Sequence, residues 1–335
     1  MVRIRQGWLV VLLAVGLLAA CKKDDKNGPA SGDKTGDKTA ESPGGGSATS
    51  DDLTYLPVDS EMVLGLNLGQ VQQSSLWKQF VEPKLMSGEA QSKISEFKAK
   101  CGYDPVTSVK SVSLGLKGAT GDKPTGVAVI HGLDKAKTWD CIEKNKDEMT
   151  KDGTEVTRDG DLLLLKSKRG QRAAFSFVNA GTAIAVFGDN ADAAGVKAVA
   201  AGGSTLKSSP KFLEMYKKLN TNDSLWVLVN GKLLEKSSLP IKARSIFGSL
   251  NVTDGLAVDL RVQFENPESA TQAAGMMNGQ AKQAQAYVDK AEFTTDGAEL
   301  HAVVVMSSQK LQALVSQLGG LLGAFAGGMG GLGTP

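Results

Sequence analysis

The side chains that could act as nucleophiles or metal ligands are few. The chain contains three cysteines, Cys21, Cys101 and Cys141, and two histidines, His131 and His301. None of them has the C-x-x-C or H-x-x-x-H spacing of a zinc site, so neither a metal site nor a cofactor is predicted. Each histidine lies at or beside an apolar run. That position favours a strand-end residue with a satisfied hydrogen bond over a catalytic base.

Motifs of serine chemistry are absent or occur in the wrong order. The sequence has no Gly-x-Ser-x-Gly elbow. Ser-x-x-Lys occurs at residues 95–98, 204–207 and 208–211, but a Lys-Thr-Gly at 34–36 precedes all of them. In serine penicillin-binding enzymes that triplet follows the nucleophile. We therefore expect no catalytic residues. The alternative is a hydrolase with an unrecognised site, in which His131 or His301 meets a serine and a carboxylate.

Cys21 directly follows an export signal. Arg3 and Arg5 precede an uninterrupted apolar run at 8–20. This run suits the core of a signal peptide and is shorter than the roughly 20 residues that a membrane-spanning helix needs. It ends in Leu18-Ala19-Ala20-Cys21, which resembles the lipobox of bacterial lipoproteins. The resemblance implies thioether lipidation of Cys21, cleavage before it and acylation of the new amine. The alternative is an ordinary secretory signal with a chance cysteine.

The expected location is the bacterial cell envelope, with the protein held on a membrane by its N-terminal lipid. Several acyl chains together anchor a protein stably, whereas a single chain binds only marginally. Lys22 follows the cysteine. Under the enterobacterial sorting rule an Asp at this place retains a lipoprotein at the inner membrane, so Lys22 favours the outer membrane.

The charge balance of the mature chain excludes one class of partner. The full chain has 38 Lys and Arg and 36 Asp and Glu, and two of the cations, Arg3 and Arg5, belong to the leader. Removal of the leader leaves equal numbers of both signs, so no basic field attracts nucleic acid. The partner besides the membrane is therefore expected to be an envelope protein or a small ligand.

Residues 21–52 are expected to form a disordered tether behind the signal peptide of residues 1–20. They contain no large apolar residue, and Gly-Asp-Lys-Thr occurs twice, at 32–35 and 36–39. Such a segment cannot bury enough surface to offset its ordering entropy. A flexible chain of this length spans roughly 30 Å, which would hold the body off the bilayer.

The region after the tether repeats a short series of motifs. Asp59-Ser60 precedes an apolar run at 62–67, and Asp223-Ser224 precedes another at 225–230. Ser-Ser-Leu follows each run, and later an Asp-Gly pair divides two strand-like segments, at 159–160 and again at 296–297. The common order predicts a first half at 53–205, a second at 206–325 and a flexible glycine-rich tail at 326–335.

These halves are predicted to form an α+β fold with antiparallel sheets and helices packed on one face. The Asp-Gly pairs indicate tight hairpins, and Asp134 and Asn266-Pro267 indicate helix starts. The pattern predicts strands at 61–69, 107–117, 125–131, 173–178, 183–187, 224–230 and 256–264, and hairpins at 154–167 and 290–306. It predicts helices at 75–100, 134–149, 190–200, 209–219, 231–246, 267–289 and 307–325.

The start of the body resembles a family of exported proteins. Tyr55-Leu56-Pro57-Val58-Asp59-Ser60, an apolar strand and then Leu76-Trp77 are similar to repeats that open with Leu-Pro-x-Asp-Ser/Thr. These repeats occur in uncharacterised lipoproteins of Myxococcus-like bacteria, and the likeness covers about residues 53–305. The family has no established activity, so the resemblance implies an exported lipoprotein and nothing more specific.

Three alternatives concern the cysteines and the apolar segments. Export to an oxidising compartment favours a disulfide between Cys101 and Cys141 over two buried thiols. An apolar stripe at 311–325 suits a core-facing helix or a detachable tail that docks on a partner. An apolar ligand carried between the two halves is the alternative to a protein-binding role.

Overall fold

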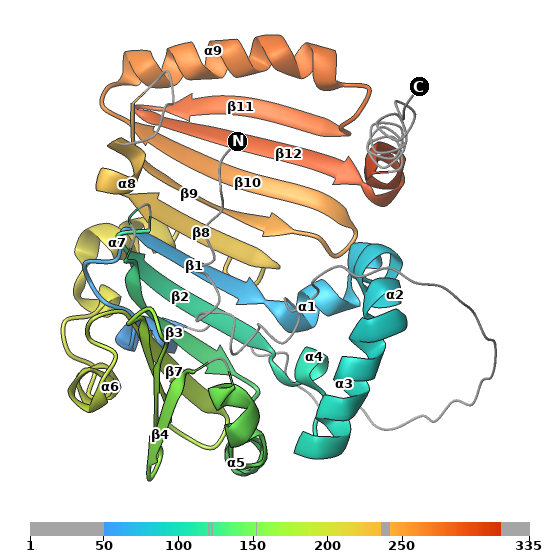
Figure 1. Ribbon diagram of the computed structural model, residues 1–335. Coiled ribbons are helices and arrows are strands. Elements are labelled where there is room, and N and C mark those ends of the chain that lie inside the picture. The colour runs from blue at the N-terminus through green and yellow to red at the C-terminus, as the bar shows by residue number, and fades with distance from the viewer. Residues whose placement is uncertain (1–49, 120, 122, 152, 236–241, 316–335) are drawn as a thin grey trace, which may run out of the picture.

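One antiparallel sheet of twelve strands runs through the folded body. The computed structural model describes residues 50–119, 121, 123–151, 153–235 and 242–315. The strand order is β11-β12-β10-β9-β8-β1-β2-β3-β7-β6-β5-β4 (Figure 1). The predicted α+β class and antiparallel pairing are confirmed. The sheets of the two halves are joined into one because β1 pairs with β8.

The first half carries its helices before β2, after β3 and after β7. Its strands are β1 (Met62–Asn67), β2 (Ser111–Lys117), β3 (Thr125–His131), β4 (Glu155–Asp159), β5 (Leu162–Lys166), β6 (Arg172–Phe177) and β7 (Thr182–Phe187). Its helical segments are η4 (Ser50–Thr54), α1 (Leu68–Gln73), η5 (Trp77–Val81), α2 (Glu82–Leu85), α3 (Gly88–Cys101), α4 (Pro105–Ser108), α5 (Lys135–Thr150) and α6 (Ala193–Ala200).

The second half is shorter. Its strands are β8 (Leu225–Asn230), β9 (Ala243–Asn251), β10 (Gly255–Phe264), β11 (Lys290–Asp296) and β12 (Glu299–Ser307). Its helical segments are η6 (Leu206–Ser208), α7 (Pro210–Tyr216), α8 (Lys232–Glu235), α9 (Pro267–Ala284) and a helix at 308–315.

Both halves follow the same order of elements. Each runs through a strand, a helical segment, two strands, a helix and a hairpin: β1 to β5 in the first and β8 to β12 in the second. They differ in the place of the hairpin. In the second half β12 pairs directly with β10, whereas in the first half β7 and β6 lie between β3 and β5. The added strands widen the first half. A common origin of the halves stays a prediction.

The two halves meet through a symmetric strand pair. Leu64 and Val227 are the third residues of their apolar runs, and they lie opposite each other in the β1–β8 ladder. Antiparallel pairing at equivalent positions is the arrangement that a two-fold axis produces. The local environment then breaks this symmetry, because Gly65 lies opposite Trp226. The indole of Trp226 occupies the space that a side chain at Gly65 would need.

The two hairpins turn at the predicted Asp-Gly pairs. Asp159 and Asp296 are the last residues of their strands, and Gly160 and Gly297 follow with φ of 57° and 55°. A positive φ costs glycine nothing and costs other residues more, so the glycine sets each two-residue turn. The Asp therefore ends a strand instead of occupying the turn.

In the first half, β2, β3, β6 and β7 bury side chains on both faces of the sheet, and helices lie on both faces. Trp139 of α5 packs on the face that carries Ile130 and Leu163, which we call the α5 face. Phe212 of α7 packs on the opposite face, with Val63 and Trp226, which we call the α7 face. Further α7-face contacts come from η4, α6 and η6. The expectation of helices on one face is thus too simple for this half, because its strands are apolar on both sides.

Helix starts follow the predicted capping residues. The Asp134 carboxylate accepts a hydrogen bond from the Lys137 amide at 2.9 Å, and α5 begins there. The Asn266 side chain accepts one from the Ser269 amide at 2.9 Å, with Pro267 at the first position of α9. These side chains satisfy amides that have no partner within the helix.

Three predicted boundaries are wrong. Of the helix expected at 231–246, the described residues show α8 at its start, and residues 243–246 belong to the strand β9 instead. Ile246 and Phe247 are apolar on opposite faces and hide the two-residue period. The strand expected from 107 begins at Ser111, since Asp104 caps the short helix α4. The tether expected to reach residue 52 ends earlier, because Asp52 is buried in the body.

Replacing Gly65 with alanine should destabilise the body. The added methyl would overlap the Trp226 indole, which is 1% exposed and cannot move into solvent. We expect Gly65→Ala to lower the free energy of unfolding by about 2–3 kcal/mol, the usual cost of overpacking a core. Denaturant unfolding measures the change. Gly275→Ala in α9 is the control, because nothing lies within 4 Å of its added methyl. There, alanine should add about 0.5–1 kcal/mol. Equal effects at both sites would contradict this account.

Candidate functional site: an aliphatic face at the junction

The junction of the two halves carries a continuous set of aliphatic side chains on the α5 face. They stand in three rows that cross the strands. The rows are Met62, Val229 and Ile246; Leu64, Val227 and Leu260; and Leu66, Leu225, Leu250, Val258 and Val304. Each of these side chains is partly exposed. We call this set the aliphatic face.

The aliphatic face lies between two helices. On the first-half side, α5 covers the same face of the sheet through Trp139. On the far side, α9 packs through Ala270, Ala273 and Ala274 against Phe264 and Leu300. The four-residue helix α8 contacts β8 and β9. Apart from it, Figure 1 shows no described helix on this face over the middle of β8, β9 and β10. An apolar sheet face is therefore left half-exposed where the rest of the sheet is covered.

The opposite side of the same strands is polar beyond α7. Asp259, Arg261 and Gln263 alternate with the aliphatic residues of β10, and Glu299 and His301 do so on β12. The second half is thus amphipathic in the manner of a sheet with one solvated face. Its apolar face has α9 over one end only, and the aliphatic face is the part that α9 leaves uncovered.

An ion-pair network orders the polar side. Glu299 is 7% exposed and accepts hydrogen bonds from Lys218 Nζ at 2.8 Å and Arg261 Nη1 at 3.1 Å. Burial alone would raise the pKa of Glu299, but the hydrogen bonds from Lys218 and Arg261 outweigh it and hold the pKa below its ordinary value. Asp259 lies beside this network and contacts His301 Nε2 at 2.8 Å.

Replacing Glu299 with glutamine should remove a pH-dependent contribution to stability. Because the folded pKa of Glu299 is lowered, its contribution is present above the ordinary glutamate pKa of about 4.3 and is lost as pH falls through the folded value. We expect Glu299→Gln to cost about 1–2 kcal/mol at pH 7 and progressively less below about pH 4. Urea unfolding at both pH values is the measurement. A difference that stays constant across this range would rule out the linkage.

His131 forms part of a buried hydrogen-bonded chain. Its Nε2 contacts Asp52 Oδ1 at 2.8 Å, and its Nδ1 contacts Thr182 Oγ1 at 3.2 Å. The other oxygen of Asp52 accepts a hydrogen bond from the Ser113 hydroxyl at 2.5 Å. A carboxylate, an imidazole and a hydroxyl therefore lie in line. The sequence did not identify Asp52 or Thr182, because η4 and β7 meet only in the folded sheet.

This chain fixes the start of the body to the sheet. Asp52 is 2% exposed and joins η4 to β2 through Ser113 and to β3 through His131. Thr182 is the cross-strand partner of His131, a common way to satisfy a strand-end histidine. Two hollows in the described surface lie elsewhere, one around α7 and one around the end of α9. The arrangement accounts for a buried carboxylate without requiring a substrate.

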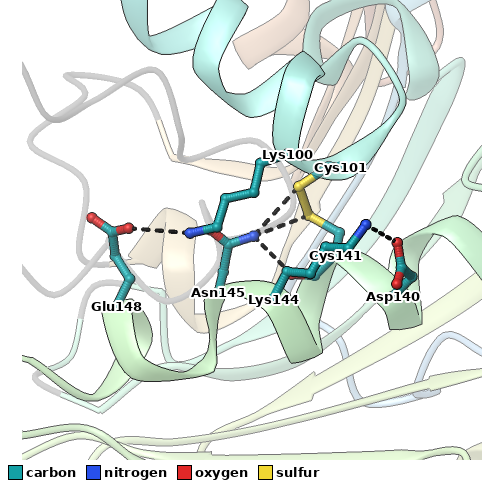
Figure 2. Close-up of a disulfide and its surroundings, with 7 residues drawn as sticks. All are labelled: Lys100, Cys101, Asp140, Cys141, Lys144, Asn145 and Glu148. Carbon is teal, nitrogen blue, oxygen red and sulfur yellow. Dashed lines mark hydrogen bonds and ion pairs between the residues drawn. A yellow bond between two sulfur atoms is a disulfide. The ribbon is translucent and has the colours of Figure 1, made fainter.

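The predicted disulfide between Cys101 and Cys141 is confirmed. Its Cα atoms are 4.6 Å apart, and it ties the end of α3 to the buried side of α5 (Figure 2). Asn145 Nδ2 lies over the bond, 3.4 Å from each sulfur, and also donates to the Cys141 carbonyl at 2.7 Å. The bridge therefore holds the α1–α3 segment against the helix that flanks the aliphatic face.

Removing this bridge should destabilise the first half. The bond closes a segment with a sequence separation of 40, for which the loss of chain entropy on cross-linking predicts about 3–4 kcal/mol. We expect a variant with Cys101→Ser and Cys141→Ser to lose that amount in denaturant unfolding. Dithiothreitol should lower the parent protein to the same midpoint and leave the variant unchanged. A reductant effect on the variant would show that the loss has another cause.

The described residues contain neither a cluster of metal ligands nor a helix that could span a membrane. Among the residues that the structure describes, no three His, Cys, Asp or Glu side chains gather as metal ligands. Within the same residues, no helix has the length and hydropathy needed to cross a bilayer. Cys21 and the leader lie outside the described residues. The apolar stripe at 311–325 lies inside them only up to Val315, where Leu311 is buried.

The aliphatic face is the site that sequence reasoning missed as a unit. The sequence predicted all of its strands except β9. The available signal was the clean alternation of β10 from Leu256 to Phe264, which indicates one apolar and one polar face. Which helix covers that apolar face depends on the order of strands, and the sequence pattern does not give it.

Comparisons with known proteins add little. No protein-family model matches the chain, and no curated protein matches it. Among solved structures, crystal forms III and IV of a protein named TP0453 are similar with a TM-score of 0.47 each. They are 13% and 10% identical to this chain, cover 79% of it, and are themselves covered over 97% and 96% of their length. A similarity this low supports no statement about function.

Proposed function

We propose that this chain is a non-catalytic lipoprotein of the bacterial cell envelope whose folded body binds an apolar partner on the aliphatic face. The observation that carries the binding role is the half-exposed set of aliphatic side chains between α5 and α9. The anchor rests on the sequence, where Leu18-Ala19-Ala20-Cys21 follows a signal-peptide core. The lipid would hold the body at a membrane, and the face would make the specific contact.

The size of the face suits a modest affinity. Adjacent strands lie about 4.8 Å apart, so the face spans roughly 19 Å from β12 to β1. Its rows extend about 13 Å along the strands, which gives an area of roughly 250 Å². Covering that area contributes about 6 kcal/mol at most, before the cost of association is subtracted. Retention at the membrane by the lipid raises the local concentration of the body and offsets part of that cost.

A photo-crosslinking experiment tests the binding role. A photoreactive amino acid replaces Val258 on the aliphatic face, and the control replaces Val303, which is partly exposed on the opposite side of the sheet. We expect irradiation of intact envelopes to give a specific adduct at Val258 and none at Val303. Adducts at neither position, or equal adducts at both, would remove the binding role of the face.

The anchor is tested separately. The acylated chain should fractionate with membranes, and a Cys21→Ser form should lose its lipid and that association. Mass spectrometry of the mature N-terminus reads the modification directly. A mature N-terminus without acyl chains, or a product found wholly in the cytosol, would overturn the anchored location while leaving the face untouched.

A further inference from the structure

The aliphatic face offers a ligand no polar group at all. Its side chains are only Met, Leu, Val and Ile, and none carries a hydrogen-bond donor or a charge. The backbone beneath it is also satisfied, because β1, β8, β9, β10 and β12 each have a neighbour on both sides. A polar ligand group pressed onto this surface would lose its hydrogen bonds to water and gain none. The surface therefore selects hydrocarbon.

Geometry argues against the common protein partners. A stable interface between two copies buries about 800 Å² on each, and the face provides roughly a third of that. An extended peptide binds by adding a strand to a sheet edge, and the strands of this face have no free edge. Both macromolecular modes would thus have to use surfaces other than this one.

The rows of the face fit a chain molecule. Side chains on one face of a strand repeat about every 7 Å, so neighbouring rows of the face lie about that far apart. The middle row is interrupted at Gly248, which lies between Val227 and Leu260 and has no side chain. A flexible hydrocarbon chain can lie between two such rows, across the strands from β12 to β1.

We infer that the aliphatic face binds the acyl chain of a membrane lipid, a ligand class that rests on the proposed function. The lipid is a separate molecule and not the chain's own anchor. The anchor would carry several acyl chains, and each buried methylene stabilises their insertion in the bilayer by about 0.8 kcal/mol. The roughly 250 Å² of the face is too small to accept all of them together. The ligand's head group stays in water at the edge of the face.

Binding of saturated fatty acids to the full chain tests this inference. The protein carries Cys21→Ser so that no lipid of its own competes, and isothermal titration measures the dissociation constant for chains of 8 to 16 carbons. The face covers one side of a bound chain, about half of full burial, so each methylene should tighten binding about twofold. The gain should stop once the chain exceeds the span of roughly 19 Å.

Matched variants localise the binding. Val258→Asn and Val304→Asn alter cross-strand partners on the aliphatic face, whereas Val303→Asn and Val305→Asn make the same change on the opposite face. We expect the first pair to weaken binding at least tenfold and the second pair to leave it within twofold. Equal losses in both pairs, or affinity that does not depend on chain length, would overturn the inference.

Other outcomes separate this inference from the proposed function. A discrete protein crosslinked at Val258, with no fatty acid binding, would keep the binding role and overturn the lipid. A chain ending at Val315 that binds fatty acid where the full chain does not would show that residues 316–335, which contain no charge, occupy the face. Self-association lost in Val258→Asn would assign the face to a second copy. Both results would overturn the inference.

Discussion

The pairing of β1 with β8 is the contact on which the rest of the body depends. It joins strands that are 163 residues apart at Leu64 and Val227, and it turns two small sheets into one of twelve strands. Its α7 side is sealed by Trp226, which fits only because Gly65 has no side chain. Its α5 side is the centre of the aliphatic face. The same ladder therefore holds the halves together and presents the surface between them.

The two sides of the second half have different means of stabilisation. On the α7 side, Glu299, Arg261 and Lys218 compensate one another in a partly buried network, so that side is complete without a partner. On the α5 side, α9 packs by alanines, which bring the helix close but bury little area. The sheet was left with apolar surface that its own described helices do not cover. That imbalance is the physical basis for a binding role.

The first half is fastened more tightly. Helices pack on both of its faces, the Cys101–Cys141 bridge ties α3 to α5, and Asp52 fixes the start of the body through His131 and Ser113. The carboxylate, imidazole and hydroxyl of this last group also occur together in hydrolases. Here Asp52 also accepts a hydrogen bond from Ser113, and the hydroxyl on the other side of His131 belongs to its cross-strand partner Thr182. These contacts join η4, β2, β3 and β7, which suits a clasp. The first half is thus held by helices on both faces and by cross-links, whereas the second half has few helices over its apolar face. This difference leaves the aliphatic face partly exposed.

The sequence by itself determined the local elements. Capping at Asp134 and Asn266, the glycines at 160 and 297, and the alternation along β10 depend on neighbours in the chain, so they were readable in advance. The pairing of Cys101 with Cys141 followed from their being the only cysteines in the body. The tertiary structure determined which residues far apart in the sequence come into contact. β9 was hidden because its adjacent residues Ile246 and Phe247 are both apolar although they lie on opposite faces. The aliphatic face exists only because β1 adjoins β8 while α5 and α9 lie on either side.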